Sequence, residues 1–352
     1  MNKIVFLIGS LGGGGAERVT ISLANYFSKK GYLITLIAFS KENNNYEIND
    51  SVQIKYLPEK KSKISNFKRV LSLKNILKEE KPNVVISLGL GYQFLFFGNL
   101  LKKYHFILSE RNSPNDFYTT TASKIYTKYC YKRADCVVFQ TREAANYYKN
   151  IVKKISVVIP NPIKEELPLP YQGVREKRIV AVSRLDPQKN LLLLLKGFEI
   201  FSARYPEYIL EIYGKGKQRE ELIKFAKSVS LEDKIIFKGQ VDNVHEKILN
   251  STMYISTSNY EGMSNSMLEA MALGLPVICT DCPIGGARAV IKHGTNGLLI
   301  QTNNLEDLVK AMFKIVENPE FASQLAQNAS RLRTDLSIEK IAPEWEKLIN
   351  YK

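Results

Sequence analysis

Two acidic residues, Glu261 and Glu269, stand eight positions apart within residues 259–278. Glu261 lies in a polar turn, and Glu269 lies in a run whose apolar residues recur at helical spacing. The backbone N–H groups at the start of that helix, from about Met263 to Asn265, would form an anion site between the two carboxylates. A phosphate flanked by hydroxyl-rich groups fits this arrangement, and a nucleotide sugar is such a ligand.

A basic segment at residues 182–190 follows a strand-like run and precedes a helix-like one. It contains Arg184 and Lys189, and ligands of open α/β sheets bind outside the carboxyl ends of the strands. An arginine and a lysine at that place can clamp a diphosphate and stabilise the charge on a departing phosphate. Two loop cations are also common as plain surface charges, but the Glu261 segment favours the functional interpretation.

A glycine loop at residues 9–18 also follows a predicted strand and opens a helix, and residues 12–15 are all glycine. Such a run lets the backbone approach a ligand closely, although a turn that serves only packing is the plainer alternative. No acid follows in residues 35–40 to hold a ribose, as a dinucleotide-binding motif would require, and no P-loop sequence is present.

Strand and helix patterns form two series, separated by a proline-rich segment at about residues 160–178. Strands that alternate with helices predict the α/β fold class, with a parallel, doubly wound sheet in each half. The strands expected in the first half are 3–8, 33–38, 52–56, 84–87, 106–108, 137–139 and 156–159. Those expected in the second half are 179–182, 209–213, 235–237, 253–255, 277–279 and 297–300.

The length of 352 residues suits two domains. We expect no membrane span, because no apolar run is long enough, and the N-terminal residues indicate a buried strand rather than a signal peptide. The four cysteines include Cys279 and Cys282, but no second Cys-x-x-Cys accompanies them, so we interpret them as reduced structural residues.

The net charge of +15 is uneven: residues 1–175 hold 27 Lys+Arg and 13 Asp+Glu (+14), and residues 176–352 hold 23 and 22 (+1). This asymmetry favours anionic partners for the first half, and nucleic acid, an anionic membrane surface and a phosphorylated substrate all fit. A solvated lysine-rich surface is the alternative.

On these motifs the chain resembles the retaining glycosyltransferases of family four, which have the GT-B fold. The resemblance covers both halves and rests on residues 12–18, 183–190 and 261–277 and on the turn with Gly214 and Gly216. It implies two Rossmann-like domains that face a cleft. Residues 1–165 would bind the acceptor and residues 175–334 the nucleotide-sugar donor, while a helix in residues 335–352, anchored by Trp345, would cross back onto the first domain.

The implied activity is retaining transfer of a hexosyl or N-acetylhexosaminyl unit from a nucleoside diphosphate sugar, preferably a UDP-sugar. Arg184, Lys189 and Glu261 would be catalytic: the two cations would hold the diphosphate and Glu261 would contact sugar hydroxyls. Glu269 would hold the ribose, and the base would lie against the backbone near Gly239. The full donor site would comprise Gly14, Gly15, Arg184, Lys189, Gly214, Gly239, Val241, Glu261, Gly262, Met263, Ser264, Asn265 and Glu269.

The chain has no Asp-x-Asp, the motif with which metal-using glycosyltransferases hold a cation. The resemblance therefore implies that no metal and no other cofactor is needed. One departure from the family pattern concerns the middle strand of the first half, where Glu110 and Arg111 follow and His105 precedes the strand. Glu110 would act as a base or an orienting group, with Arg111 on an acceptor phosphate, or the two would form an internal structural pair.

The acceptor side carries two basic helical patterns with apolar or aromatic neighbours, which suit an anionic bilayer surface. We therefore expect a lipid-diphosphate-linked or oligosaccharide acceptor of surface polysaccharide, lipopolysaccharide or capsule, and a cytoplasmic protein peripheral to the inner face of the cell membrane. The first pattern has Lys60, Lys61, Lys63, Lys68, Arg69, Lys74, Lys78 and Lys81; the second has Lys124, Lys128 and Lys132 among Tyr126, Tyr129 and Tyr131. Arg111, Lys61, Lys68, Arg69, Lys128 and Lys132 are the acceptor and membrane candidates.

Three alternatives stay open from the sequence. A nucleotide-sugar epimerase or a phosphorylase would share the fold. A basic, non-catalytic module that binds nucleic acid or membranes belongs to another class, but no nucleic-acid motif is recognised and the two glutamates would disfavour a phosphate backbone. We therefore expect no nucleic-acid partner.

Overall fold

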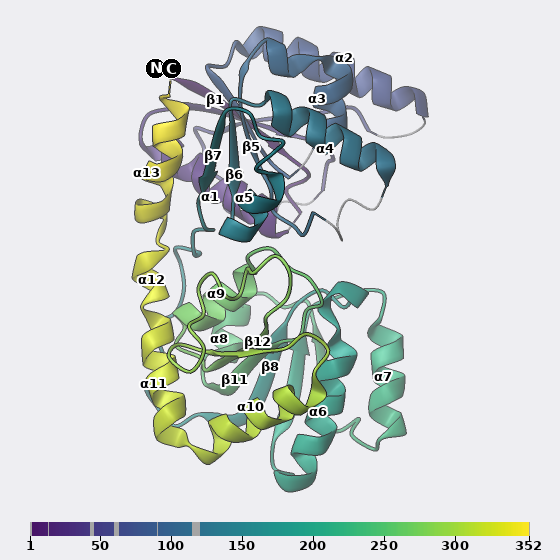
Figure 1. Cartoon of the computed structure of the whole chain (residues 1–352), viewed down its shortest axis with the longest axis vertical. Coiled ribbons are helices and arrows are strands. Elements are labelled where there is room, and N and C mark those ends of the chain that lie inside the picture. Colours follow the sequence, from purple (N-terminus) through teal and green to yellow (C-terminus); the bar gives the residue numbers. More distant parts are fainter. Residues whose placement is uncertain are drawn as a thin grey trace. The chain divides into compact units, whose positions relative to one another are not determined.

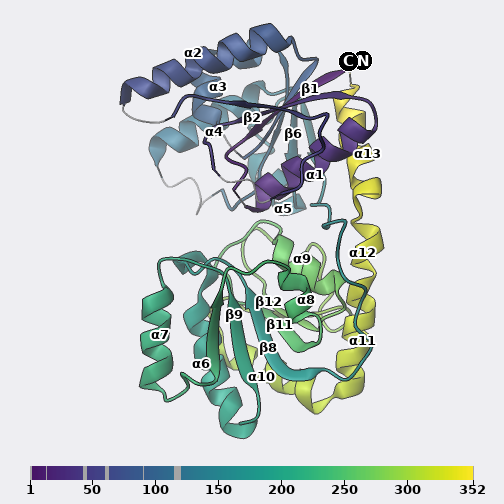
Figure 2. The same cartoon turned by 180° about the vertical axis from the view of Figure 1, so that it is seen from behind.

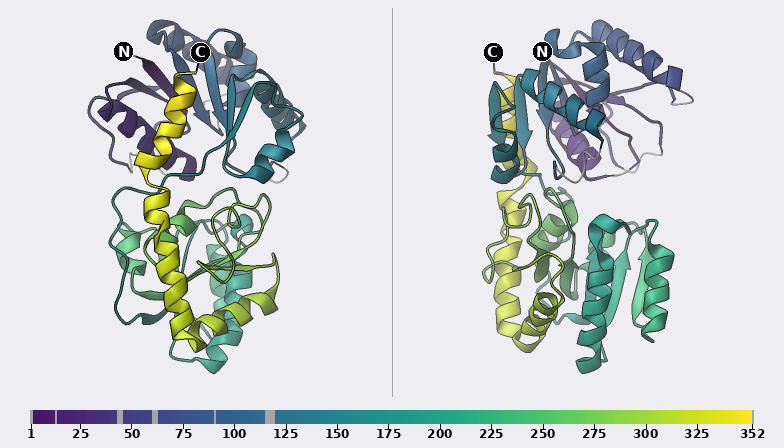
Figure 3. Two further views of the ribbon diagram at one scale, coloured as in Figure 1. Left: turned by 60° about the vertical axis from the view of Figure 1, so that its left-hand side comes forward. Right: turned by 45° about the vertical axis from the view of Figure 1, so that its right-hand side comes forward.

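The structure is a computed structural model that describes residues 2–12, 14–42, 46–59, 63–89, 91–114 and 120–351, with the backbone alone at 63–65. Its contacts divide the chain into two units. Unit 1 comprises Met1–Pro162 and Ile338–Lys352, and unit 2 comprises Ile163–Ser337. Each unit is a parallel β-sheet with helices on both faces (Figures 1 and 3).

The sheet of unit 1 has the strand order β3-β2-β1-β4-β5-β6-β7. All of its strands pair in parallel. The inner strands β1, β4, β5 and β6 are mostly apolar and buried, as expected for strands covered on both faces, whereas the edge strands β3 and β7 are partly exposed. They are β1 (Lys3–Ile8), β2 (Leu33–Ala38), β3 (Gln53–Tyr56), β4 (Val84–Leu88), β5 (His105–Ser109), β6 (Cys136–Phe139) and β7 (Ile155–Val158).

Helices α2, α3 and α4 of unit 1 pack side by side, whereas α1 packs with the C-terminal helix α13 (Figure 2). The indole of Trp345 in α13 is fully buried, and Asn2 and Asn350 share a hydrogen bond of 3.0 Å, so the two ends of the chain lie together. The helices are α1 (Gly15–Lys29), α2 (Lys63–Glu80), α3 (Tyr92–Gly98), η1 (Leu100–Lys102), α4 (Thr121–Arg133), α5 (Arg142–Tyr148) and α13 (Ile338–Ile349).

The sheet of unit 2 has the order β10-β9-β8-β11-β12-β13, so the strand order reverses between β8 and β11. Its strands are β8 (Glu176–Val182), β9 (Ile209–Tyr213), β10 (Ile235–Gly239), β11 (Ser251–Ser256), β12 (Val277–Thr280) and β13 (Leu298–Ile300). Its helices are η2 (Pro187–Lys189), α6 (Leu191–Arg204), α7 (Arg219–Ser228), α8 (Val244–Ile248), α9 (Asn265–Ala272), α10 (Leu305–Glu317), α11 (Pro319–Ser330) and α12 (Leu332–Asp335).

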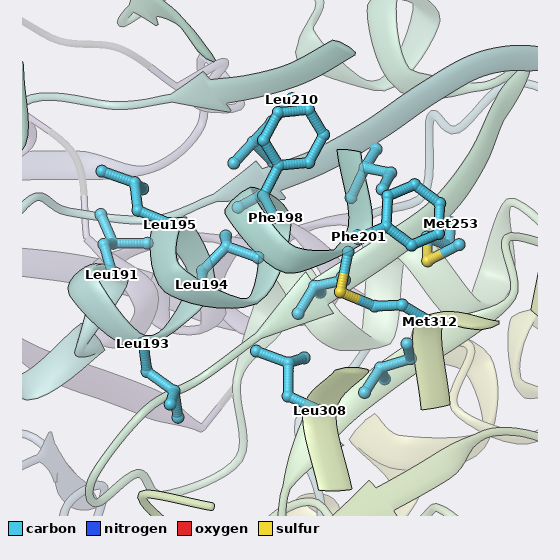
Figure 4. Close-up of a cluster of buried hydrophobic side chains, with 14 of the residues drawn as sticks. Leu191, Leu193, Leu194, Leu195, Phe198, Phe201, Leu210, Met253, Leu308 and Met312 are labelled. Carbon is cyan, nitrogen blue, oxygen red and sulfur yellow. The ribbon is translucent and has the colours of Figure 1, made fainter. Parts of the chain in front are cut away.

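The core of unit 2 fixes the position of α6. Phe198 and Phe201 of this helix are fully buried and pack with Leu210 of β9 and with Leu308 and Met312 of α10 (Figure 4). The burial of an aromatic side chain contributes about 1.5–3 kcal/mol, so α6 is firmly seated on the sheet. The loop that leads into its N-terminus is thereby held at the carboxyl edge.

Each strand expected from the sequence is present, with ends displaced by at most three residues. His105 was expected before its strand, but it is the first residue of β5 and pairs with Val84. The expected unit boundaries were residues 165 and 335, and the contacts divide the chain after Pro162 and after Ser337. Over the residues that the structure describes, no helix has both the length and the apolar composition that crossing a bilayer requires.

Candidate functional site

The loops that follow β8, β9, β10 and β11 are joined at the carboxyl edge of the unit 2 sheet. The Leu185 N–H donates to the Lys215 carbonyl at 2.9 Å, and the Asn259 N–H donates to the Gln188 carbonyl at 2.8 Å. Because the strand order reverses between β8 and β11, this edge is the place where doubly wound sheets bind ligands.

Glycine is required where the loop after β9 approaches the loop after β8. Gly214 has φ of +135°, and a Cβ on it would lie 1.9 Å from the Ser183 carbonyl oxygen. A Cβ on Gly216 would lie 2.2 Å from the Leu185 carbonyl oxygen. A side chain at either position would displace the loop that carries Arg184. Both positions therefore require glycine, because the backbones of the two loops lie too close together for a Cβ atom.

Lys189 and Glu261 form the central contact of this edge. The Lys189 ammonium donates to Glu261 Oε2, and the two side chains are only 12% and 19% exposed. The Thr257 hydroxyl donates to the carbonyls of Lys189 and Asn190, each at 3.0 Å, and so ties the two loops together again. The structure therefore brings together one predicted cation and one predicted acid from strands that are neighbours in the sheet.

Arg184 is held at the mouth of the same loop. Its guanidinium contacts the Asp186 carboxylate at 2.9 Å and donates to Gln188 Oε1 at 3.0 Å, while its side chain is 69% exposed. The Gln188 Nε2 in turn donates to the Tyr260 carbonyl at 2.9 Å. One partner contacts each terminal nitrogen, and an exposed guanidinium with five N–H donors can still offer the remaining N–H groups to an anion.

Helix α9 begins at the anion site that the sequence predicts. Ser264 caps it by accepting from the Met267 N–H at 3.4 Å. Gly286 packs on the turn before the helix, because a Cβ there would lie 1.6 Å from the Gly262 carbonyl oxygen. The start of α9 therefore has a fixed position relative to Glu261, whose N–H donates to the Pro283 carbonyl at 3.1 Å.

Glu269 lies within α9, as predicted, and is 8% exposed. Its Oε2 lies 2.9 Å from Nε2 of His245, which belongs to α8 and follows β10. The imidazole thus orients the carboxylate of the predicted ribose contact. No local sequence pattern pointed to His245, because it is 24 positions away from its partner.

Gly239 ends β10 and Val241 follows it, next to a network around the buried Glu211. Gly239 has φ of +70° and open space around a Cβ position, and its carbonyl accepts from the Gly214 N–H at 2.8 Å. Glu211 in β9 is 5% exposed and contacts Arg178, Tyr213 and Lys238. Burial alone would raise the pKa of Glu211, but the hydrogen bonds and these charges outweigh it and lower the pKa.

The glycine loop belongs to unit 1. Gly15 is the first residue of α1, and the Tyr46 hydroxyl contacts both the N–H and the carbonyl of Gly14, at 3.0 and 3.1 Å. Both glycines are exposed, and Gly13 lies outside the described residues. The loop therefore presents backbone at the carboxyl edge of the unit 1 sheet.

Glu110 and Arg111, for which the sequence leaves a catalytic and a structural role open, are both buried within unit 1. Glu110 is 1% exposed and accepts from the N–H groups of Arg111 and Asn112 and from the Tyr131 hydroxyl. Arg111 is 8% exposed, donates to Asn161 and lies 5.6 Å from the Trp345 ring, and burial lowers its pKa to about 10. Both side chains thus connect β5 to its surroundings within unit 1.

One membrane candidate is corrected by the structure. Arg69 is 7% exposed, because its guanidinium donates to the Phe39 carbonyl and lies 4.9 Å from the Phe94 ring, so it is not available to a bilayer surface. Tyr131 is likewise buried. Lys68, Lys128 and Lys132 are exposed, whereas Lys60 and Lys61 lie outside the described residues.

The cysteines are free thiols buried in the two cores, as a structural role requires. Burial, with the charge of Glu261, raises the pKa of the Cys282 thiol to about 12, so it stays protonated. Across the described ranges, no cluster of three or more His, Cys, Asp or Glu side chains is arranged to hold a metal ion.

Comparisons with known proteins match both units. Residues 13–167 match the model of Glycosyltransferase Family 4, and residues 172–332 match that of Glycosyl transferases group 1. An uncharacterized glycosyltransferase of Haemophilus influenzae is 29% identical over 359 residues, which cover 99% of this chain and 100% of that protein. A second relative, from Campylobacter jejuni, is 27% identical over 358 residues, which cover 99% of this chain and 98% of that protein. It is the GalNAc-α-(1→4)-GalNAc-α-(1→3)-diNAcBac-PP-undecaprenol α-1,4-N-acetyl-D-galactosaminyltransferase. Staphylococcus aureus TarM, solved with fondaparinux, α-GlcNAc-glycerol and UDP, aligns over both full chains with a TM-score of 0.85 at 17% identity.

Proposed function

Because the chain belongs to the family-four glycosyltransferases with the GT-B fold, we propose that it transfers a hexosyl or N-acetylhexosaminyl unit from a UDP-sugar with retention of configuration. The observation that carries this proposal is the contact between Lys189 and Glu261 at the carboxyl edge of unit 2. An ammonium group can bind phosphate and a carboxylate can accept from sugar hydroxyls, so a hydrogen-bonded pair of the two supports this proposal. The UDP in the TarM structure supports the choice of nucleotide.

The donor would lie across the loops after β8, β10 and β11. Arg184 and Lys189 would bind the diphosphate, together with the amides from Gly262 to Asn265 at the start of α9. Lys189 must then exchange its contact with Glu261 for phosphate oxygens, which frees the carboxylate for the sugar. The same cations would stabilise the charge that develops on the departing nucleotide.

The nucleoside would occupy the β10 side of this edge. Glu269, oriented by His245, would accept from the ribose hydroxyls. The base would lie against the backbone at Gly239 and Val241, where a Cβ position on Gly239 has no neighbour within 4 Å. Gly14 and Gly15 of unit 1 would serve the acceptor.

No metal is needed in this proposal, because fixed cations and a helix N-terminus take the charge of the leaving diphosphate. Transfer should therefore persist in excess EDTA. A loss of activity in EDTA that Mg²⁺ or Mn²⁺ restores would refute this part of the proposal.

The acceptor is proposed to be a lipid-diphosphate-linked or oligosaccharide glycan in bacterial surface polysaccharide assembly. The name of the Campylobacter relative, with its undecaprenol diphosphate acceptor, supports this choice. Unit 1 also exposes large apolar side chains on α2, α3 and α4, and exposed lysines on α2 and α4, as a protein bound at an anionic inner membrane face would. They are Phe67 (66%), Leu71 (42%), Phe97 (61%) and Ile125 (52%), with Lys68, Lys128 and Lys132 nearby in sequence.

Sedimentation with liposomes tests the membrane part. Wild-type protein should sediment with anionic vesicles at low salt and dissociate as the salt concentration rises. The variant Phe67→Ser with Phe97→Ser should sediment less, because both side chains would enter the bilayer interface. Equal recovery in the supernatant with and without anionic vesicles would remove the membrane claim.

Acceptor dependence separates this proposal from its alternatives. The protein is incubated with individual nucleotide sugars, with and without a diphosphate-linked glycan lipid. Release of UDP only when the acceptor is present is expected. Conversion of the donor sugar to its epimer without any acceptor would favour an epimerase, and dependence on inorganic phosphate would favour a phosphorylase.

A further inference from the structure

A cavity of about 450 Å³ lies on unit 1 between the second half of α4 and the segment that joins α5 to β7. Tyr129, Asn150 and Ile151 form part of its lining, and none of the described residues that line it is acidic. Its other lining residues are all cations: Lys128, Lys132, Arg133 and Lys153.

The cavity lies at the opposite edge of the sheet from the glycine loop. Arg133 ends α4 just before β6 begins, and Lys153 precedes β7 by two residues. Residues that lead into parallel strands lie at the amino edge, whereas the glycine loop follows β1 at the carboxyl edge. The cavity is therefore separate from the carboxyl edge that is proposed to bind the donor, although Lys128 and Lys132 also belong to the proposed membrane surface.

The cations of the cavity have no neutralising partners in the described part of the chain. Lys128, Lys132 and Lys153 form no ion pair there, whereas the adjacent Lys154 contacts Asp135 at 2.6 Å. The Arg133 guanidinium lies 4.2 Å from the centre of the Tyr129 ring, which fixes its plane. Four like charges around one hollow repel each other, and a bound anion would relieve that repulsion.

We propose that this cavity binds a phosphate group with two negative charges, carried by a lipid headgroup or by a small phosphorylated solute. A guanidinium matches phosphate oxygens bidentately, and lysines add point charges around it. Tyr129 and Ile151 supply apolar contact for the organic part that bears the phosphate. The proposal does not rest on glycosyl transfer, because none of the donor residues contributes to the cavity.

Lysine modification with a limiting amount of an amine-reactive reagent, followed by mass spectrometry, tests the site residue by residue. Pyrophosphate at constant ionic strength should slow the modification of Lys128, Lys132 and Lys153 about tenfold at ten times its Kd. Lys224 and Lys227 on α7 of unit 2 are exposed internal controls. Slowing at the controls to the same extent, or no slowing at the three cavity lysines, would overturn the proposal.

The same labelling experiment with vesicles of two lipid compositions distinguishes the two sources of phosphate. Protection by phosphatidic acid vesicles, but not by phosphatidylglycerol vesicles of equal surface charge, identifies a headgroup with a phosphate monoester. Protection by pyrophosphate alone identifies a solute. Equal protection by both lipids, together with none by pyrophosphate, would show a diffuse charged surface and overturn the proposal.

A charge reversal checks that anion binding in the cavity causes the protection of its lysines. Lys153→Glu should abolish the protection of Lys128, whereas Lys224→Glu, with the same change in net charge, should leave it intact. Thermal unfolding of both variants verifies that they are folded. Undiminished protection of Lys128 in folded Lys153→Glu protein would contradict the assignment.

Discussion

At the residue scale, the side chains proposed to handle the donor are held by one another. Lys189 contacts Glu261, Arg184 contacts Gln188, and Gln188 reaches the backbone of Tyr260. These contacts connect two loops that are about seventy positions apart in sequence. The loops that carry the proposed site are therefore held in place before any ligand arrives, and donor binding has only to move Lys189 from Glu261 to phosphate oxygens. Cations held close to the leaving group are the condition for its electrostatic stabilisation.

Replacing the cations or the acid should remove that stabilisation. Arg184→Ala, Lys189→Ala and Glu261→Ala are each expected to reduce kcat/KM at least about a hundredfold. Lys196→Ala on the exposed face of α6 is the matched control and should stay near wild type. Steady-state UDP release measures the effect, and near-wild-type turnover in all three variants would dismiss the site assignment.

Gln188 is a positioning residue that sequence patterns did not single out. Gln188→Met keeps the volume but removes both hydrogen bonds, so Arg184 loses its support and kcat should fall by about tenfold. In an Arg184→Ala background the same substitution should cost much less, because the group it supports is already gone. Equal losses of kcat in both backgrounds would show that Gln188 does not act through Arg184.

At the element scale, Glu211 connects β8, β9 and β10 through Arg178, Tyr213 and Lys238. Its pKa is lower in the fold than its ordinary value of 4.5. A carboxylate with a depressed folded pKa contributes stability above the unfolded pKa, and that contribution is lost as the pH falls through the folded pKa. The free energy of unfolding should therefore decrease below about pH 4.5.

Urea unfolding across this acidic range, followed by circular dichroism, measures the effect. Glu211→Gln should lower the free energy of unfolding by about 1–3 kcal/mol at neutral pH and should flatten its decrease in acid. A parallel pH dependence in wild type and Glu211→Gln would mean that other carboxyls cause the decrease.

The order of the strands and helices could be predicted from the sequence, because each element has its own local spacing of apolar residues. Alternating strands and helices indicated two parallel sheets, and α9 with Glu269 was expected where it lies. Contacts between distant segments have no such local signal. The packing of Gly286 on Gly262, the pairing of His245 with Glu269 and the burial of Arg69 depend on how the chain folds back.

At the scale of the whole molecule, the C-terminal helix belongs to the unit built by the first 162 residues. Trp345 is fully buried there, beneath the Arg111 guanidinium. Trp345→Ala should destabilise unit 1 by about 3–5 kcal/mol, because it leaves a large cavity and removes the ring partner of Arg111.

Thermal unfolding by calorimetry measures this loss. Tyr351→Ala, at a side chain that is 59% exposed, is the matched control near the same terminus and should change stability by less than about 0.5 kcal/mol. An unchanged unfolding profile for Trp345→Ala would mean that unit 1 does not need α13.

The central claim is that the chain moves a sugar from a UDP donor to a glycan acceptor with retention. The most direct measurement uses an α-linked UDP-sugar labelled with ¹³C at the anomeric carbon, a diphosphate-linked glycan lipid and excess EDTA, with NMR analysis of the product. We predict that the label appears on the acceptor in an α-linkage, in equal amount to the UDP released. Label that appears in a β-linkage, in free sugar alone or in an epimerised donor would contradict the account.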